Sequence, residues 1–111
     1  MSNYSLSGHV ALVTGSSKGL GASIVRNLAS AGASVAVNAF NNVERAREVA
    51  DGINEGGGKA IAVGADVTKS TEIAALVEET ASKLGPIDIV VPNATGPQPL
   101  KPIEEYDESF Y

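Results

Sequence analysis

Apolar residues follow two spacings that alternate along the chain. Short continuous apolar runs, rich in β-branched residues, predict buried strands at 10–13, 34–38, 59–65 and 87–91. Between these runs, apolar residues recur at every third or fourth position, which predicts amphipathic helices. The expected apolar stripes are Leu20, Ile24, Val25 and Leu28, then Val43, Ala46, Val49, Ala50 and Ile53, then Ile73, Leu76, Val77, Thr80 and Leu84. Ser70 is the expected N-cap of the last helix, and glycines follow the end of each helix.

This alternation of strand and helix predicts a parallel α/β sheet formed by a single domain, residues 1–111. Right-handed crossovers place the first two helices on one face of the sheet. If the strand order is 3-2-1-4, the third helix crosses to the other face. A ligand would then bind between strands 1 and 4, at their carboxyl ends.

Three glycines lie at the corner between the strand 10–13 and the helix that follows it. Gly15, Gly19 and Gly21 have the spacing G-x-x-x-G-x-G. A tight turn, close approach to a bound group and close packing of helix on strand each require a residue without Cβ. Free N–H groups and the positive end of the helix predict a bound phosphate or pyrophosphate. The alternative is an ordinary glycine-rich loop. A G-x-x-x-x-G-K-[ST] phosphate loop is excluded, because Leu20 stands where that motif needs glycine.

Composition excludes several other classes of function. The net charge of −5 argues against nucleic acid or an anionic membrane as partner. No apolar run approaches the length of a transmembrane helix. The chain has no cysteine, which excludes disulfides and thiol catalysis and favours a cytoplasmic location. The single histidine, His9, is expected to be a solvated loop residue; the alternative, a ligand or base, lacks a cluster of partner residues.

The segment Thr14–Gly21 resembles the T-G-x-x-x-G-x-G signature of the short-chain dehydrogenase/reductase family. The lead-in at 6–13 is similar to the family's usual opening, with His9 where a lysine is common. The resemblance implies a Rossmann-type fold and an oxidoreductase, of 3-oxoacyl-reductase-like kind, acting on a ketone or secondary alcohol with NAD(P)(H). The implied cofactor-binding residues are Gly15, Ser17, Lys18, Gly19, Leu20, Gly21, Asn38, Ala39, Phe40, Asp66, Val67, Asn93 and Ala94.

The segment 38–42 bears on the choice between NADP and NAD. An acidic residue about 20 positions beyond the glycine motif would bind the adenosine 2′-hydroxyl of NAD. In the family that aspartate aligns with Ala39, and no acid occurs here before Glu44. A carboxylate would repel a 2′-phosphate by about 4 kcal/mol at ~4 Å and an effective dielectric of ~20. Lys18 resembles the basic residue that NADP-using members carry, although it could be a solvated loop lysine. The prediction is NADP(H) in preference to NAD(H).

Two further segments resemble family motifs. Asp66 and Val67 are similar to an Asp-Val pair whose aspartate contacts the adenine amino group. The alternative for Asp66 is a turn aspartate beside Thr68. The segment 92–96 resembles the family's N-N-A-G turn. Asn93 and Ala94 match it, whereas Pro92 replaces the first asparagine and removes a backbone donor.

Family catalysis uses a serine, a Tyr-x-x-x-Lys pair and a helix asparagine. No lysine stands four residues after Tyr4, Tyr106 or Tyr111. The resemblance therefore implies only the cofactor-binding half of the family's domain, truncated before the second half and inactive by itself. The alternative function is a stand-alone nucleotide-binding or oligomerising module. The apolar strand 87–91 would lie at a sheet edge, which predicts a homo-oligomer.

Overall fold

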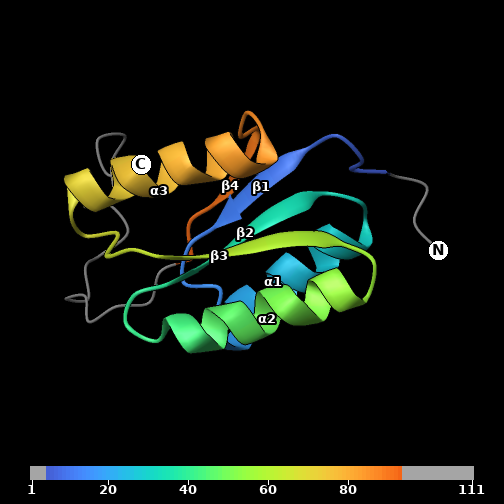
Figure 1. The fold of residues 1–111 in the computed structure, drawn as a ribbon, viewed down its shortest axis with the longest axis horizontal. Helices are drawn as coiled ribbons and strands as arrows, with labels where there is room; N and C mark the ends of the chain where they lie inside the picture. Colours follow the sequence, from blue (N-terminus) through green and yellow to red (C-terminus); the bar gives the residue numbers. More distant parts are fainter. Residues whose placement is uncertain (1–4, 94–111) are drawn as a thin grey trace, which may run out of the picture.

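The computed structural model of the chain describes residues 5–93 (Figure 1). Strands and helices alternate along this whole range. In chain order they are β1 (Val10–Val13), α1 (Gly19–Ser30), β2 (Ser34–Ala39), α2 (Val43–Glu55), β3 (Lys59–Gly64), α3 (Ser70–Leu84) and β4 (Ile89–Val91).

The strands form one parallel sheet in the order β3-β2-β1-β4, as predicted from the sequence. The central strand β1 pairs with β2 on one side and β4 on the other, so that Leu12 lies between Ala36 and Val90. Helices α1 and α2 cover one face of the sheet and α3 covers the other (Figure 1). All four strands therefore direct their carboxyl ends toward one edge of the sheet, where the glycine corner lies.

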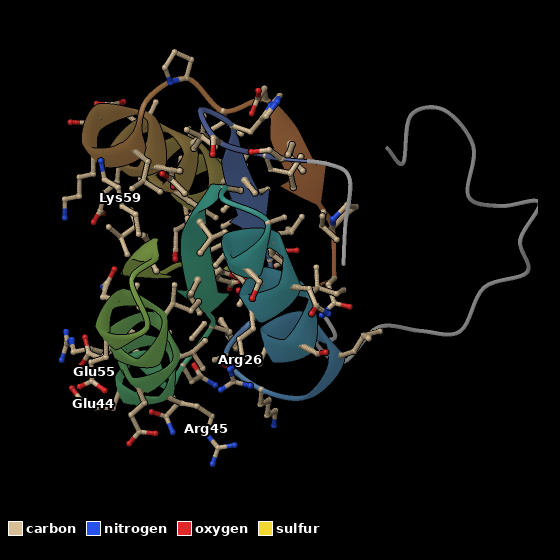
Figure 2. All side chains as sticks on the ribbon, turned by 90° about the vertical axis from the view of Figure 1, so that its right-hand side faces the viewer. Arg26, Glu44, Arg45, Glu55 and Lys59 are labelled. Carbon is tan, nitrogen blue, oxygen red and sulfur yellow. The ribbon has the colours of Figure 1, made fainter. Side chains whose placement is uncertain are left out.

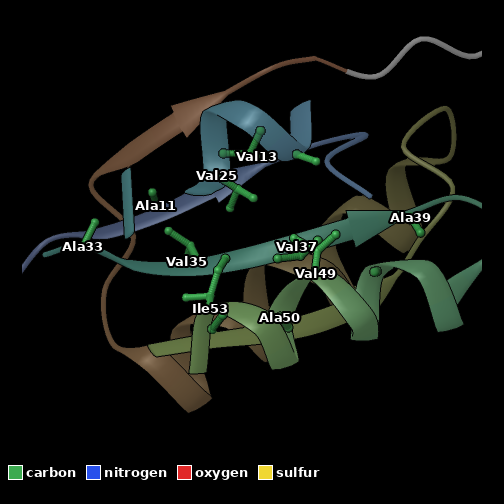
Figure 3. Packing of buried hydrophobic residues seen from close by; sticks show 13 residues of the cluster. Ala11, Val13, Val25, Ala33, Val35, Val37, Ala39, Val49, Ala50 and Ile53 are labelled. Carbon is green, nitrogen blue, oxygen red and sulfur yellow. The ribbon is translucent and has the colours of Figure 1, made fainter. Parts of the chain in front are cut away.

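The core has two layers, one on each face of the sheet. Alternate strand residues point to opposite faces, so Val35 and Val37 pack beneath α1 and α2 (Figure 3). Ala36 belongs to the second layer, with Leu12, Val63 and Leu76 of α3. Burial on both faces explains why the strands read as continuous apolar runs. Charged side chains lie outside these layers: Figure 2 shows Glu44, Arg45 and Glu55 on the outer surface of α2.

Three predicted stripe residues are exposed. Leu20 is 69% exposed, because it lies in the first turn of α1, beyond the point where β1 ends. Ile73 and Val77 of α3 are also exposed, and the fully buried side chains of this helix are Leu76 and Thr80. The stripe on α3 is thus narrower than the sequence pattern predicts.

Several element boundaries differ from the sequence prediction, and two of these differences are a single residue: β2 ends at Ala39 instead of residue 38, and β3 ends at Gly64 instead of residue 65. The helix α3 begins at Ser70, and Lys69 occupies the N-cap position without a side-chain hydrogen bond. Strand β4 begins at Ile89 instead of residue 87. The preceding Asp88 turns its side chain toward the start of β1, where its Oδ1 accepts a hydrogen bond from Val10 N. Within residues 5–93, no helix is both long and apolar enough to cross a membrane.

Candidate functional site

The glycine corner connects β1 to α1 at the carboxyl edge of the sheet. Gly15 and Gly19 have φ angles of +59° and +60°, which favour glycine. A Cβ on Gly19 would meet no atom of the described residues within 4 Å, so the backbone is open to a bound group there. A Cβ on Gly21 would clash with the carbonyl oxygen of Gly15 and lie 2.5 Å from Asn93 Nδ2. The corner therefore has the turn, the open approach and the close packing that the spacing predicts.

Ser16 and Asn38 fasten the corner to β2. Ser16 N donates to Asn38 O at 2.9 Å, and Asn38 N donates to Ser16 Oγ at 2.9 Å. The Ser16 hydroxyl in turn donates to Val13 O at 2.7 Å. Both side chains are buried. Ser16 is not among the site residues predicted from the sequence. The signal available was a small hydroxyl residue directly after the turn glycine at a strand end.

The Asn38 side chain points into the protein instead of toward a bound group. Its Oδ1 accepts from Gly15 N at 2.9 Å, and its Nδ2 lies 3.2 Å from Val63 O and 3.4 Å from Ala65 O. Only 2% of the residue is exposed. The polar atoms that a cofactor contact would need are thus bonded to the chain itself.

Asn93 fastens the corner from the β4 side. Asn93 N donates to Thr14 Oγ1 at 2.8 Å, and Asn93 Nδ2 donates to Gly15 O at 3.3 Å. Thr14 N also donates to Val91 O. Gly15 is therefore held by Asn38 on one side and Asn93 on the other. Ala94, the neighbouring predicted site residue, lies outside the described residues.

The outer surface of the corner carries the remaining predicted residues. Ser17 is partly buried, whereas Lys18, Gly19 and Leu20 are exposed. The first N–H groups of α1 have no acceptor within the helix, and the helix end carries about half a unit of positive charge. This surface fits an anionic group. At the end of β2, Phe40 is 56% exposed but Ala39 is only 1% exposed, with its carbonyl bound to Ala65 N.

Asp66 follows β3 and forms a tight turn with Thr68. The Thr68 hydroxyl and the Thr68 N–H both donate to Asp66 Oδ1, at 2.6 and 3.0 Å. These two bonds, the hydroxyl first, hold the pKa of Asp66 below its ordinary value, so the carboxyl is an anion at neutral pH. Val67 is partly buried against the core layer beneath α3. No group of three or more metal-ligating side chains is present within residues 5–93.

His9 lies just before β1 with its side chain 45% exposed, and it pairs with Asp88. Its Nδ1 lies 2.5 Å from Asp88 Oδ2, while Asp88 Oδ1 accepts from Val10 N at 2.8 Å. The Val10 N–H, and next the His9 ring, hold the pKa of Asp88 below its ordinary value. This pair joins the amino ends of β1 and β4, at the opposite edge of the sheet from the glycine corner. Its separation along the chain explains why local sequence patterns do not reveal it.

Comparison with known proteins agrees with this geometry. The sequence profile of the family described as short chain dehydrogenase matches residues 9–110. The chain is 45% identical over 108 residues to a hydroxynaphthalene reductase-like protein of Metarhizium brunneum, covering 96% of this chain and 40% of that relative. It is also 45% identical over 100 residues to a hydroxynaphthalene reductase of Aspergillus fumigatus, covering 90% of this chain and 36% of the relative.

Solved structures show the same likeness. A hydroxysteroid dehydrogenase from Escherichia coli superimposes with a TM-score of 0.79 at 40% identity, over 92% of this chain and 44% of that one. A short chain dehydrogenase from Burkholderia cenocepacia in complex with NADP gives a TM-score of 0.76 at 43% identity, over 80% and 36%. The chain thus spans 36–44% of the length of these similar proteins.

Proposed function

We propose, since the chain belongs to the short-chain dehydrogenase/reductase family, that residues 14–21 form the pyrophosphate site of an NADP(H)-dependent oxidoreductase. The observation that carries the proposal is the open backbone at Gly19 in the first turn of α1, where the N–H groups have no acceptor within the helix. The predicted cofactor-binding residues on either side of Gly19 in the sequence are Ser17, Lys18, Leu20 and Gly21. When bound, the reduced dinucleotide supplies a hydride.

The adenosine end of the cofactor would lie along the ends of β2, β3 and β4. Asp66 keeps one carboxylate oxygen in its turn with Thr68, and the other oxygen would accept from the adenine amino group. Phe40 would contact the ribose side from the end of β2, and Asn93 and Ala94 would line the other side. Val67 and Ala39 would shape the pocket from partly or fully buried positions.

The preference for NADP is part of the proposal. The end of β2 carries no acid up to Asn42, and the first acid, Glu44, is ion-paired with Arg47 on α2. Lys18 is exposed beside Gly19 and would pair with the 2′-phosphate. Calorimetric titration should therefore give tighter binding of 2′,5′-ADP than of AMP. Equal affinities would contradict the NADP assignment.

A pair of lysine variants sharpens that titration. Lys18→Ala should reduce the ratio of the affinities for 2′,5′-ADP and AMP by up to about fivefold. The effect is small because an exposed ion pair contributes little binding free energy. Lys59→Ala removes the same charge at the amino end of β3 (Figure 2) and should leave the difference unchanged. An equal effect of both variants would indicate a general charge effect instead of a 2′-phosphate contact.

The reaction proposed for the whole protein is the interconversion of a ketone and a secondary alcohol. A 3-oxoacyl compound is one candidate substrate. The names of the fungal relatives favour a second candidate, a hydroxynaphthalene-type aromatic ketone. These 111 residues contain no Tyr-x-x-x-Lys pair. Taken alone they should oxidise NADPH with neither class of ketone, since lost general acid catalysis costs roughly 10²- to 10⁴-fold in rate. Robust turnover in that assay would contradict this reading.

A homo-oligomer is also proposed. Within residues 5–93, β4 pairs only with β1, and its Val90 is 60% exposed. An apolar strand edge favours pairing with a second copy of the chain.

A further inference from the structure

We infer that Asn38 is a positioning residue: it does not touch the cofactor but holds the glycine corner and the segment leading to Asp66 in fixed relation. The inference rests on the proposed function, because it concerns how that site is shaped. It differs from the expectation drawn from sequence, in which Asn38 is itself a cofactor contact.

The bonds of Asn38 reach the ends of two neighbouring strands. Its Oδ1 accepts from Gly15 N, in the corner after β1. Its Nδ2 donates to Val63 O and Ala65 O, on either side of the last residue of β3. Its own backbone belongs to β2, which lies between them. One buried amide therefore links the carboxyl ends of β1, β2 and β3.

Only an amide suits this position. One side of the group meets an N–H donor and the other meets two carbonyl acceptors, so the oxygen and nitrogen cannot exchange places. A carboxylate would place an oxygen against the Val63 and Ala65 carbonyls. An alanine would leave Gly15 N without this acceptor in a partly buried corner, which costs free energy.

The hydrogen bonds of the Asn38 side chain affect both the pyrophosphate part and the adenine part of the proposed site. Gly15 N is already bonded, so the N–H groups left for a phosphate come from the later residues of the corner and the start of α1. Ala65 directly precedes Asp66, and Ala65 N also donates to Ala39 O at 3.0 Å. A shift of this linkage would move the pyrophosphate and adenine contacts relative to each other.

Asn54 provides a matched control. Its side chain also makes two backbone hydrogen bonds, accepting from Ala60 N at 2.8 Å and donating to Ala60 O at 3.0 Å. It fastens α2 to the start of β3, at the edge of the sheet opposite the glycine corner. Its loss should lower the thermal stability without altering the site.

The test measures the affinity of the 111-residue chain for NADP⁺ by calorimetry and its melting temperature. Asn38→Ala should lower the affinity about tenfold or more, whereas Asn54→Ala should leave it within about twofold. Both variants should lower the melting temperature. An unchanged affinity in Asn38→Ala, or an equal loss in Asn54→Ala, would overturn the inference.

Asn38→Asp gives a second readout, the pH dependence of the affinity for NADP⁺. A role of Asn38 in stability alone would not produce such a dependence. Burial raises the pKa of a carboxyl, and the protonated acid can donate to one of the two carbonyls. The affinity of this variant, relative to the wild type at the same pH, should therefore recover as the pH falls from about 8 to about 5. These affinity measurements on Asn38→Asp at several pH values replace those on Asn38→Ala if the alanine variant does not fold. A constant ratio to the wild type across the range would overturn the inference.

Failure of the proposed function is distinguishable from failure of this inference. A folded wild-type chain that binds no NADP⁺ contradicts the proposed function. Amide hydrogen exchange then decides the role of Asn38. Asn38→Ala should lose protection at Gly15 and Ala65 while Leu12 in β1 keeps it. Unchanged exchange at Gly15 and Ala65 would show that Asn38 holds neither segment.

Discussion

At the scale of single residues, Gly21 is packed against its neighbours without room for a side chain. An added Cβ would meet Gly15 O, Asn93 Nδ2 and Ser16 Cα. Gly21→Ala should therefore destabilise the fold by about 1–3 kcal/mol, the usual cost of overpacking. Urea unfolding measures this change.

Gly52→Ala is the control for that substitution. Gly52 lies inside α2, and a Cβ there would meet nothing within 4 Å. Alanine favours a helix interior, so this variant should gain up to about 1 kcal/mol. A similar loss in both variants would show that the loss in Gly21→Ala does not come from the close contacts at Gly21.

The Asp88 carboxyl should make the stability depend on pH. Its pKa is lowered in the folded chain, by the Val10 N–H first and the His9 ring next. A lowered folded pKa means that its contribution is present above the unfolded value and is lost as the pH falls through the folded value. The melting temperature should therefore decline below about pH 4. Asp88→Asn should show less of this decline, and an identical pH profile would contradict the role given to Asp88.

Spacing alone predicted the backbone geometry of the corner but not the direction of every side chain. The glycines of the corner have the backbone geometry expected from G-x-x-x-G-x-G. Leu20 was expected both in the buried stripe and at the cofactor. Its exposure excludes a place in the buried stripe. Asn38 and the His9–Asp88 pair depend on partners far along the chain. Local patterns carry no information about such contacts.

At the scale of secondary structure, Leu76 is the fully buried apolar side chain that α3 contributes to the core. Leu76 is 1% exposed and packs with Leu12 and Val63, whereas its neighbour Val77 is 41% exposed. Leu76→Ala should cost about 2–5 kcal/mol, while Val77→Ala should cost less than about 1 kcal/mol. Denaturant unfolding measures both, and comparable losses would show that α3 is held more evenly.

Leu76→Met serves as a second variant in case Leu76→Ala does not fold. It keeps the side-chain volume nearly constant, so its cost should stay below about 1.5 kcal/mol.

The existence and order of the helices follow from the 3.6-residue period. The width of each buried stripe does not, because it depends on how much of the sheet lies beneath the helix.

At the scale of the whole molecule, the exposed edge of the sheet should govern self-association. Val90→Lys places a charge on an edge strand, which opposes pairing between copies. Light scattering at micromolar concentrations should show a mass above the monomer for the wild type and a lower mass for this variant. Ser82→Lys adds the same charge on an exposed position of α3 and should not change the mass. A wild-type chain that stays monomeric would contradict the proposed assembly.

The strand order was predictable because handedness and the position of the glycine motif leave few arrangements. The length of β4 was not predictable from the apolar pattern. The strand begins at Ile89, and Asp88 just before it contacts Val10 twice: its N donates to Val10 O, and its Oδ1 accepts from Val10 N.

The central position of β1 has a consequence for the order in which the protein forms during synthesis. Its partner β2 follows within a short stretch of chain, but the contact between Val10 and Asp88 joins residues 78 apart. When β3 has left the ribosome, β1, β2 and β3 can pair, while the other edge of β1 remains bare until β4 arrives. Late closure of long loops slows folding and exposes strand edges to aggregation. Pulsed hydrogen exchange during refolding should accordingly protect Val35 and Val37 before Val91, and simultaneous protection would exclude this sequence of events.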